Sequence, residues 1–350
     1  MTQSLRRAGA PAMICICLLA LIGSLTTARA WDRADVDVFA TLPAGATGPE
    51  GLTVGVDGKV YVTTFGFNAQ GEQPGPGKLY VFNDDGRLLR QVNVANSTSH
   101  LLGLAFHPST HALLIIDFGA GKVLNVDPQT GTSSVFMTVT GSSGLNALTF
   151  DSSGNVYVSD SFQGVIWKTG ASGGAATPWV ADPLLVPNGI PPFGANGLAF
   201  NRAGSALFVA NTANDAIVKF PVTGGTPGTP QALVYGINGA DGIVLDRSDN
   251  IWVAANQSDE IVVIDPTGKV VAKLGDFGGI KKDGTPRGLF FPASPDFSKE
   301  GKNLFVTNLA LDLRFAGGPQ TLQSQWADQV KRYTISRIKA RIPDFKDHDD

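Results

Sequence analysis

One phrase recurs six times along the sequence, and this repeat restricts the possible folds more than any other feature. In each copy a residue, usually polar, precedes a Gly-aliphatic pair or a close variant of it. A short strand of alternating character, a tight turn and a second strand follow. The residue before the pair falls at positions 50, 102, 146, 196, 241 and 287, so the intervals are 52, 44, 50, 45 and 46 residues. A period of about 47 residues is typical of repeat architectures such as propellers.

Two more strand-like segments complete each unit. They cover 78–82 and 88–94 in the first unit, and 260–264 and 269–274 in the fifth. Four antiparallel strands per unit describe a blade, so we predict an all-β fold, a six-bladed β-propeller, over residues 31–343. A β-sandwich or a β-helix does not explain four strands per period. The sixth unit has a third strand near 329–335 but no clear fourth, and we predict that the N-terminal strand 36–40 pairs with blade six and closes the ring.

The first 30 residues have the features of a secretory signal peptide. Arg6 and Arg7 precede an apolar core over 13–21, and Ala28-Arg29-Ala30 has the small-x-small pattern of a cleavage site. The alternative is a membrane anchor, although the apolar core is short for a bilayer span. We predict a periplasmic or secreted protein with no stable membrane anchor after signal removal, and a flexible acidic tail over 344–350.

Composition excludes several classes of function. Cys15 and Cys17 are the only cysteines and lie in the predicted signal, so the mature chain has no thiol for a disulfide, a zinc–thiolate site or catalysis. The 27 Lys and Arg against 30 Asp and Glu give a net charge of -3 and no basic surface for nucleic acid. We expect a monomer that acts on a small-molecule substrate.

One mouth of the propeller channel is predicted to collect polar side chains. The innermost strand of each blade opens there, with Glu50, Leu102, Asn146, Asn196, Asp241 and Arg287. The second strands are antiparallel to the first and end at the same mouth, with Thr64, Asp117, Asp160, Asn211, Ala255 and Asn308. The longest connections, 65–77, 182–193 and 309–327, belong to this face, and functional residues concentrate on such connections.

Carboxylates and amides without thiols or imidazoles form a hard-oxygen site, which suits Ca²⁺, with Mg²⁺ or another hard divalent ion as alternatives. Ca²⁺ is favoured because scattered ligands make a loose cage, whereas Mg²⁺ requires tight octahedral geometry. The other interpretation is that these polar groups only solvate a water-filled channel.

The pattern of Glu in blade one, Asn in blades three and four and Asp in blade five resembles the calcium site of the senescence-marker-protein/gluconolactonase (regucalcin-like) superfamily of six-bladed propellers. This resemblance implies Glu50, Asn146, Asn196 and Asp241 as metal ligands, and the blade-five Asp as a candidate base or nucleophile. The superfamily includes lactonases and phosphotriesterases. Its sugar-lactonase members tend to have Arg where this chain has Gly144 and Asp where it has Ala147, which argues against a gluconolactone-type substrate.

The predicted chemistry is metal-dependent hydrolysis of a lactone or a related ester, in which a carboxylate activates water. Asp241 is the first candidate for this base and Asp160 the second. Arg287 either neutralises an anionic substrate group or forms an ion pair with Asp241 or Glu50. The other predicted substrate-binding residues are Asp117, Asn211, Asn308 and His100. The alternative function is a non-catalytic, NHL-like propeller that binds a ligand or protein around a structural calcium ion.

Overall fold

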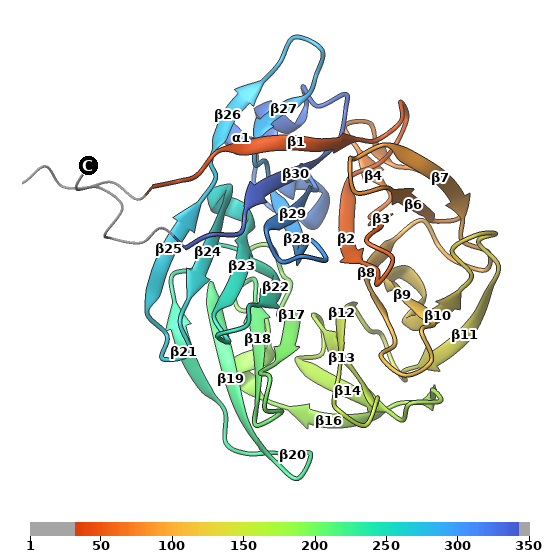
Figure 1. Ribbon diagram of the computed structural model, residues 1–350, viewed down its shortest axis with the longest axis vertical. Coiled ribbons are helices and arrows are strands. Elements are labelled where there is room, and N and C mark those ends of the chain that lie inside the picture. Colours follow the sequence, from red (N-terminus) through yellow and green to blue (C-terminus); the bar gives the residue numbers. More distant parts are fainter. Residues whose placement is uncertain (1–31, 343–350) are drawn as a thin grey trace, which may run out of the picture. The chain divides into compact units, whose positions relative to one another are not determined.

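The computed structural model describes residues 32–342. The predicted signal peptide and acidic tail lie outside these residues. Within this part of the chain, six sheets of antiparallel strands follow one another around a central channel, so the predicted six-bladed β-propeller is confirmed (Figure 1). No helix among the described residues is long and apolar enough to cross a membrane.

Each blade is built in chain order from the channel outwards, except the sixth. Blade one contains β2 (Pro49–Val54), β3 (Val60–Thr64), β6 (Lys78–Phe82) and β7 (Leu88–Asn93). Blade two contains β8 (Leu101–Phe106), β9 (Leu113–Asp117), β10 (Lys122–Val126) and β11 (Ser133–Thr138), with the short β15 (Gly174–Ala175) beside β11. Blade three contains β12 (Leu145–Phe150), β13 (Val156–Asp160), β14 (Val165–Thr169) and β16 (Thr177–Ala181). Blade four contains β17 (Ala195–Phe200), β18 (Ala206–Asn211), β19 (Ala216–Thr223) and β21 (Gln231–Tyr235), with the short β20 (Thr226–Pro227) beside β19. Blade five contains β22 (Ala240–Leu245), β23 (Ile251–Ala255), β24 (Glu260–Ile264) and β25 (Val270–Leu274).

Blade six begins later than the sequence predicts. Its innermost strand is β28 (Pro292–Phe297), followed by β29 (Asn303–Asn308) and β30 (Thr334–Lys339). The Gly288-Leu289 pair imitates the repeated phrase, but Arg287 belongs to β27 (Pro286–Gly288), which forms a separate hairpin with β26 (Phe277–Ile280). The prediction that Arg287 opens the innermost strand is therefore wrong. Pro292 pairs with Asn308 as Pro49 pairs with Thr64, so Ala293 takes the position of Glu50.

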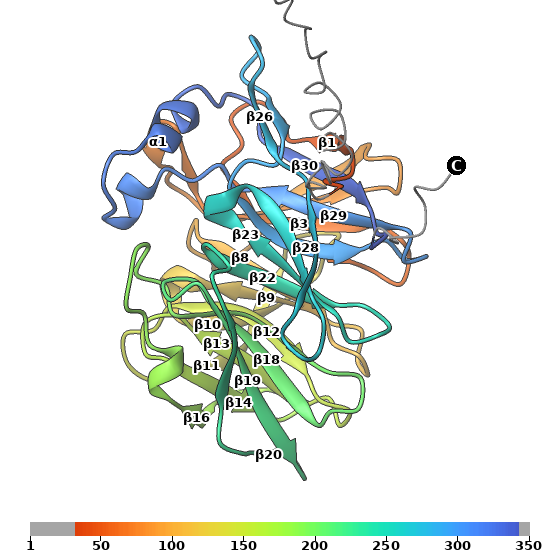
Figure 2. The ribbon, with the colours of Figure 1, turned by 90° about the vertical axis from the view of Figure 1, so that its left-hand side faces the viewer.

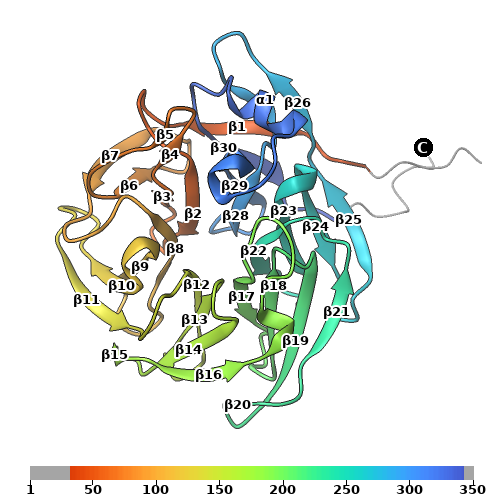
Figure 3. The same cartoon turned by 180° about the vertical axis from the view of Figure 1, so that it is seen from behind.

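The long connections contain short elements that lie on one face of the ring. They are the hairpin of β4 (Phe67–Asn68) and β5 (Gly71–Glu72), the 3-10 turns η1 (Phe118–Ala120), η2 (Pro183–Leu185), η3 (Asn256–Ser258) and η4 (Leu313–Ala316), and helix α1 (Leu322–Ala327). Figure 2 shows α1 on one side of the blades, and Figure 3 shows the ring from that side. The repeat pattern did not predict the helix in the 309–327 connection.

In blades one, three and five, the tight turn on the opposite face depends on one aspartate. In blade three, Asp151 accepts hydrogen bonds from the backbone N–H groups of Ser153 and Asn155 and from the Tyr157 hydroxyl. The turn ends at Gly154 with φ of 78°, a conformation that glycine adopts without a steric cost. These bonds hold the Asp151 carboxylate in its ionised form and lower its pKa.

The innermost strands of neighbouring blades approach one another closely around the channel. A Cβ atom on Gly103 would lie 2.6 Å from the Asn146 carbonyl oxygen, and one on Gly242 would lie 2.5 Å from the Ala293 carbonyl oxygen. Real Cβ atoms do not come this close to backbone, so the glycine of the repeated phrase is required by packing between blades.

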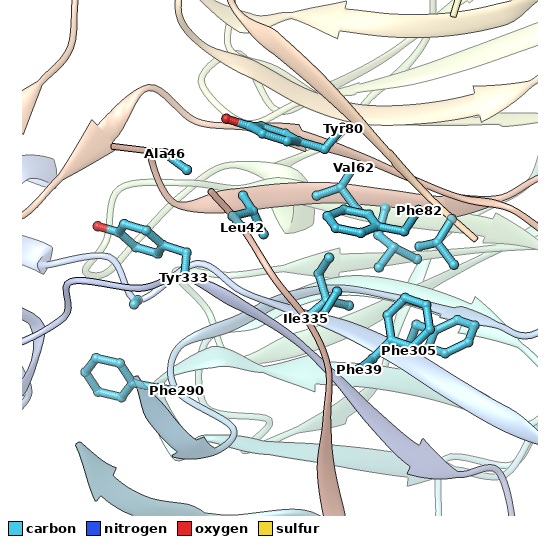
Figure 4. Packing of buried hydrophobic residues seen from close by; sticks show 14 of the residues in the cluster. Phe39, Leu42, Ala46, Val62, Tyr80, Phe82, Phe290, Phe305, Tyr333 and Ile335 are labelled. Carbon is cyan, nitrogen blue, oxygen red and sulfur yellow. The ribbon is translucent and has the colours of Figure 1, made fainter. Parts of the chain in front are cut away.

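The ring is closed by β1 (Val36–Thr41), which pairs antiparallel with β30 as the outermost strand of blade six. This confirms the predicted closure, although β30 starts five residues later than the predicted 329–335 segment. Phe39 is 7% exposed and its ring centroid lies 4.2 Å from that of Phe305. Figure 4 shows both rings beside Ile335 in a core that blades one and six share.

Phe39→Ala removes an aromatic side chain from this closure, and we expect it to lower the free energy of unfolding by about 3–5 kcal/mol. The matched control is Val38→Ala in the same strand, because Val38 is 41% exposed and its truncation costs at most about 0.5 kcal/mol. Urea unfolding of both variants measures the difference. An equal effect of the two substitutions would contradict the assigned closure.

Candidate functional site

The predicted ligand set meets in one pocket at the mouth of the channel. Glu50, Asn146, Asn196 and Asp241 all line it, each 4–5% exposed. They occupy the same place in blades one, three, four and five, which is the second residue of the innermost strand. Blades two and six have Leu102 and Ala293 at this place. The cavity is narrow, about 30 Å³, which is room for roughly two water molecules.

The two asparagines are oriented by hydroxyl groups. Asn146 donates through Nδ2 to Ser161 Oγ at 3.3 Å, and Ser161 in turn donates to the Ala195 carbonyl oxygen of the next blade at 2.7 Å. Asn196 donates to Thr212 Oγ1 at 2.9 Å, and this hydroxyl donates to the Ala240 carbonyl oxygen at 2.7 Å. A hydroxyl has one proton to donate, so each must accept from the asparagine. The amide oxygens, which are the atoms able to bind a cation, therefore face away from the hydroxyls.

Asp241 is held by Asn256, which stands in blade five where Ser161 and Thr212 stand in blades three and four. Asn256, in η3, donates through Nδ2 to Asp241 Oδ2 at 3.1 Å. Ser161, Thr212 and Asn256 were not predicted as site residues, yet each stands directly after the last residue of its blade's second strand. Side chains alternate along a strand, so this next position faces the channel when the strand-end residue faces the blade. That alternation is the sequence signal that could have identified them.

The two carboxylates lack a compensating charge. Burial, and secondarily the charge of Asp241, raises the pKa of Glu50 well above its usual value. Burial also raises the pKa of Asp241 to about 7, although hydrogen bonds from Asn256 and Asn196 oppose the shift. Among the described residues, Glu50 Oε2 and Asn256 Oδ1 are buried without any hydrogen-bond partner. Buried acceptors without donors fit a bound cation.

The donor set also indicates which cations fit. No group of three or more His, Cys, Asp or Glu side chains that could hold a metal ion exists among residues 32–342. The candidate ligands are the two carboxylates of Glu50 and Asp241 and the neutral amides of Asn146 and Asn196. A set of oxygen ligands of this kind suits a hard divalent cation.

The matching family model is that of the SMP-30/gluconolactonase/LRE-like region, and it covers residues 191–275, which include Asn196 and Asp241. The resemblance to this superfamily is confirmed. No curated protein matches the sequence significantly.

Solved structures share the fold at low identity. A gluconolactonase from Xanthomonas campestris is 14% identical with a TM-score of 0.60, and the match covers 89% of this chain and 98% of that chain. A calcium-binding regucalcin from Agrobacterium tumefaciens is 17% identical with a TM-score of 0.58, covering 87% and 97%. Virginiamycin B lyase from Staphylococcus aureus is 15% identical with a TM-score of 0.57, covering 87% and 99%. At these identities the likeness shows the fold, and the fold alone hosts both lactonases and a lyase.

The polar residues at the ends of the second strands do not line this pocket. Asp160, the second candidate base, is fully buried inside blade three. Its Oδ1 accepts from the backbone N–H groups of Gly144, Phe162 and Gln163, and its Oδ2 accepts from Gln163 Nε2 and the Trp167 indole. These five bonds occupy the carboxylate, and Asp160 is not among the residues that line the pocket.

The predicted substrate-binding residues Asp117, Asn211 and Asn308 are likewise hydrogen-bonded to nearby backbone groups. Asp117 accepts from Thr98 N and Oγ1 and lies 3.5 Å from Lys122 Nζ. Asn211 donates to the carbonyl oxygens of Leu184 and Val186, and Asn308 accepts from Phe290 N. All three hold connections of the chain in place, and none of them is among the residues that line the pocket.

Arg287 and His100 also lie away from the pocket. Arg287 is exposed beside Asp276 and Arg337, at the outer edge of the ring, and pairs with neither Asp241 nor Glu50. His100 stacks on Phe67, with ring centroids 5.2 Å apart, and its Nε2 lies 3.4 Å from Glu72 Oε1. Burial lowers the pKa of His100. The His100 ring also packs against Phe65, which lines the pocket.

The rest of the pocket is an apolar wall that the repeat did not predict. It consists of seven side chains: Phe65, Leu102, Pro191, Phe193, Phe291, Leu309 and Leu311. Five of them come from the connections 65–77, 182–193 and 309–327, which supports the assignment of these connections to the functional face.

Replacing Thr212 by Val should lower the free energy of unfolding by about 1–3 kcal/mol, because the buried Asn196 amide and the Ala240 carbonyl both lose their partner. Thr212→Ser retains the hydroxyl and should recover most of this loss. The control is Thr223→Val, at an exposed position of the same blade. Denaturant unfolding compares the three variants, and an undiminished stability of Thr212→Val would refute the hydroxyl's role.

Proposed function

We propose that the protein is an exported, Ca²⁺-dependent hydrolase of lactones or related esters. One observation carries this proposal: two buried carboxylates and two oriented amides meet in a single narrow pocket, and Glu50 Oε2 has no donor there. The family model and the shared fold of a gluconolactonase and a calcium-binding regucalcin support the same conclusion.

Glu50, Asn146, Asn196 and Asp241 would hold the ion through their oxygens. When bound, a Ca²⁺ ion polarises a carbonyl group and stabilises the negative charge that develops on its oxygen. The protein's own contribution is preorganisation. Ser161 and Thr212 keep the two amide oxygens turned towards the pocket, so the ligands need little rearrangement on binding.

Asp241 is the proposed base. Its carboxylate takes a proton from a water molecule as the water oxygen forms a bond to the carbonyl carbon of the substrate. The bond between that carbon and the ring oxygen then breaks, and the ring oxygen receives the proton from Asp241, which yields a hydroxy acid. Asn256 donates to Asp241 Oδ2 at 3.1 Å and so fixes the orientation of the carboxylate for this transfer.

We also propose that the mature protein is a monomer, located in the periplasm or secreted, that acts on a small molecule. The motif at Ala28-Arg29-Ala30 supports the processing step. N-terminal sequencing of the protein from the cell envelope or the medium should give a chain that begins at Trp31. An intact Met1 terminus, or retention in the cytoplasm, would refute export.

The mature protein should hydrolyse at least one member of a lactone and phosphotriester panel, and EDTA should abolish this activity until Ca²⁺ is restored. Asp241→Asn should reduce kcat by at least about a hundredfold, because the amide cannot accept the proton. Phosphotriester turnover without lactone turnover would replace the proposed substrate class. Absence of any metal-dependent turnover would favour the NHL-like alternative, a propeller that binds a ligand around a structural ion.

Ca²⁺ binding is tested separately from turnover. Saturating Ca²⁺ should raise the melting temperature of the mature protein, since a ligand that binds only the folded state stabilises it. Glu50→Gln should remove this shift. Glu72→Gln is the matched control: Glu72 is an exposed carboxylate on the same blade and outside the pocket. A shift that survives Glu50→Gln would place the ion elsewhere.

A further inference from the structure

The lining of the pocket has two chemically different parts. The polar part, here called the polar cluster, consists of Glu50, Asn146, Asn196, Thr212, Asp241 and Asn256. The remaining seven side chains form the apolar wall defined above. No Lys, Arg or His side chain is among the lining residues of the described chain. The division limits which substrates this pocket can accept.

With the proposed ion bound to the oxygens of Glu50, Asn146, Asn196 and Asp241, the polar cluster has few groups left for the hydroxyls of a substrate. The Asn146, Asn196 and Asn256 amide nitrogens donate to Ser161, Thr212 and Asp241, respectively. Thr212 uses its proton on the Ala240 carbonyl oxygen. A polyhydroxylated lactone would bring several hydroxyls into this space, and those facing the apolar wall would lose their hydrogen bonds to water without replacement.

The charge of the pocket also selects against acids. The lining formed by the described residues has no basic side chain, so an anionic substituent lying against the apolar wall would lose its hydration and find no counter-charge there. Arg287, which could have supplied one, lies at the outer edge of the ring. An uncharged substrate avoids this cost.

The side chains of the apolar wall are held in place by contacts with one another and with neighbouring rings. Phe193 stacks on Phe162 at 5.9 Å between centroids with an interplanar angle of 17°, and Phe118 packs edge-on against Phe162 at 5.4 Å. Phe65 packs against Phe118 at 5.7 Å, so one row of aromatic rings connects the blade-one and blade-three sides of the wall. On the other side, Leu309 and Leu311 are 5–6% exposed and belong to the same hydrophobic cluster as Phe65.

We propose that the pocket accepts uncharged lactones or esters with an aliphatic or aromatic substituent, in preference to polyhydroxylated or acidic ones. This inference rests on the proposed hydrolase function. The narrow space beside the polar cluster admits the reacting carbonyl group, while the substituent lies against Phe193, Leu311 and their neighbours.

The test compares kcat/KM for γ-valerolactone, γ-octalactone, D-glucono-δ-lactone and a carboxylate-bearing γ-butyrolactone. We expect γ-octalactone to exceed γ-valerolactone by about tenfold or more, because each added methylene is removed from water at the wall. The polyhydroxylated and acidic lactones should be poorer substrates than γ-octalactone by a similar factor. Preferred turnover of either one would overturn the inference and leave the hydrolase proposal standing.

Phe193→Ala should reduce the advantage of γ-octalactone over γ-valerolactone severalfold, while Phe193→Leu should retain most of it. Val186→Ala is the matched control, because Val186 lies in the same connection, is 43% exposed and does not line the pocket. A chain-length advantage that is unchanged in Phe193→Ala would also overturn the inference.

Binding of 2-butylcyclopentanone, a ketone that cannot be hydrolysed, separates the two proposals. If the ketone binds to the wild type and less to Phe193→Ala, while no lactone is turned over, the ligand class stands and the hydrolase function fails. If gluconolactone is turned over and the ketone does not bind, the function stands and the ligand class fails. Absence of both binding and turnover refutes both.

Discussion

The close approach of the innermost strands around the channel is the constraint on which the rest of the molecule depends. Glycines such as Gly103 and Gly242 permit it, because a Cβ at either position would collide with the backbone of the next blade. Hydroxyl groups then join the blades across the same gap. Thr63 donates to the Leu102 carbonyl oxygen at 2.6 Å, and Thr307 donates to the Glu50 carbonyl oxygen at 2.7 Å.

Ser161 and Thr212 use the same kind of bond to link blades three, four and five, and they orient the site's amides as well. One set of side chains therefore determines both the spacing of the blades and the direction of the ligand oxygens. This coupling keeps Glu50 and Asp241 in one pocket despite the energetic cost of burying two acids. A structure that relaxed to separate them would also have to break the contacts between blades.

The sequence was sufficient to predict the blades and the four oxygen ligands because both follow from the repeat. Four of the units place Glu50 or its counterpart at the second position of the innermost strand, from which the side chain enters the pocket at the mouth of the channel. The same logic failed in blade six, where Gly288-Leu289 imitates the phrase while β28 carries Ala293-Ser294 in its place. The spacing between the first and second strands could have indicated that blade six starts later. Ala293 lies 15 positions before Asn308, the same distance that separates Leu102 from Asp117 in blade two.

Two further errors have a physical origin. Asp160 and its counterparts were assigned to the mouth because the strand ends lie there, but strand alternation turns their side chains into the blade and the following residue towards the channel. Apart from Leu102, the side chains of the apolar wall could not be predicted individually, because the conformations of 182–193 and 309–327 depend on tertiary contacts such as the stacking of Phe193 on Phe162. Periodicity gives the position of a side chain on a strand and says little about the path of a connection.

The closure by β1 has a consequence for how the chain is made. Its pairing with β30 joins Val36 to Ile338, so the first strand of the described chain depends on the last one for its partner. Until β30 has been synthesised, β1 lacks the strand with which it pairs, and Phe39 lacks the part of its core that Ile335 supplies. Contacts between such distant residues carry a large loop-closure entropy and form slowly. A chain interrupted before residue 334 would leave β1 without a partner, so the ring can close only after β30 has been synthesised.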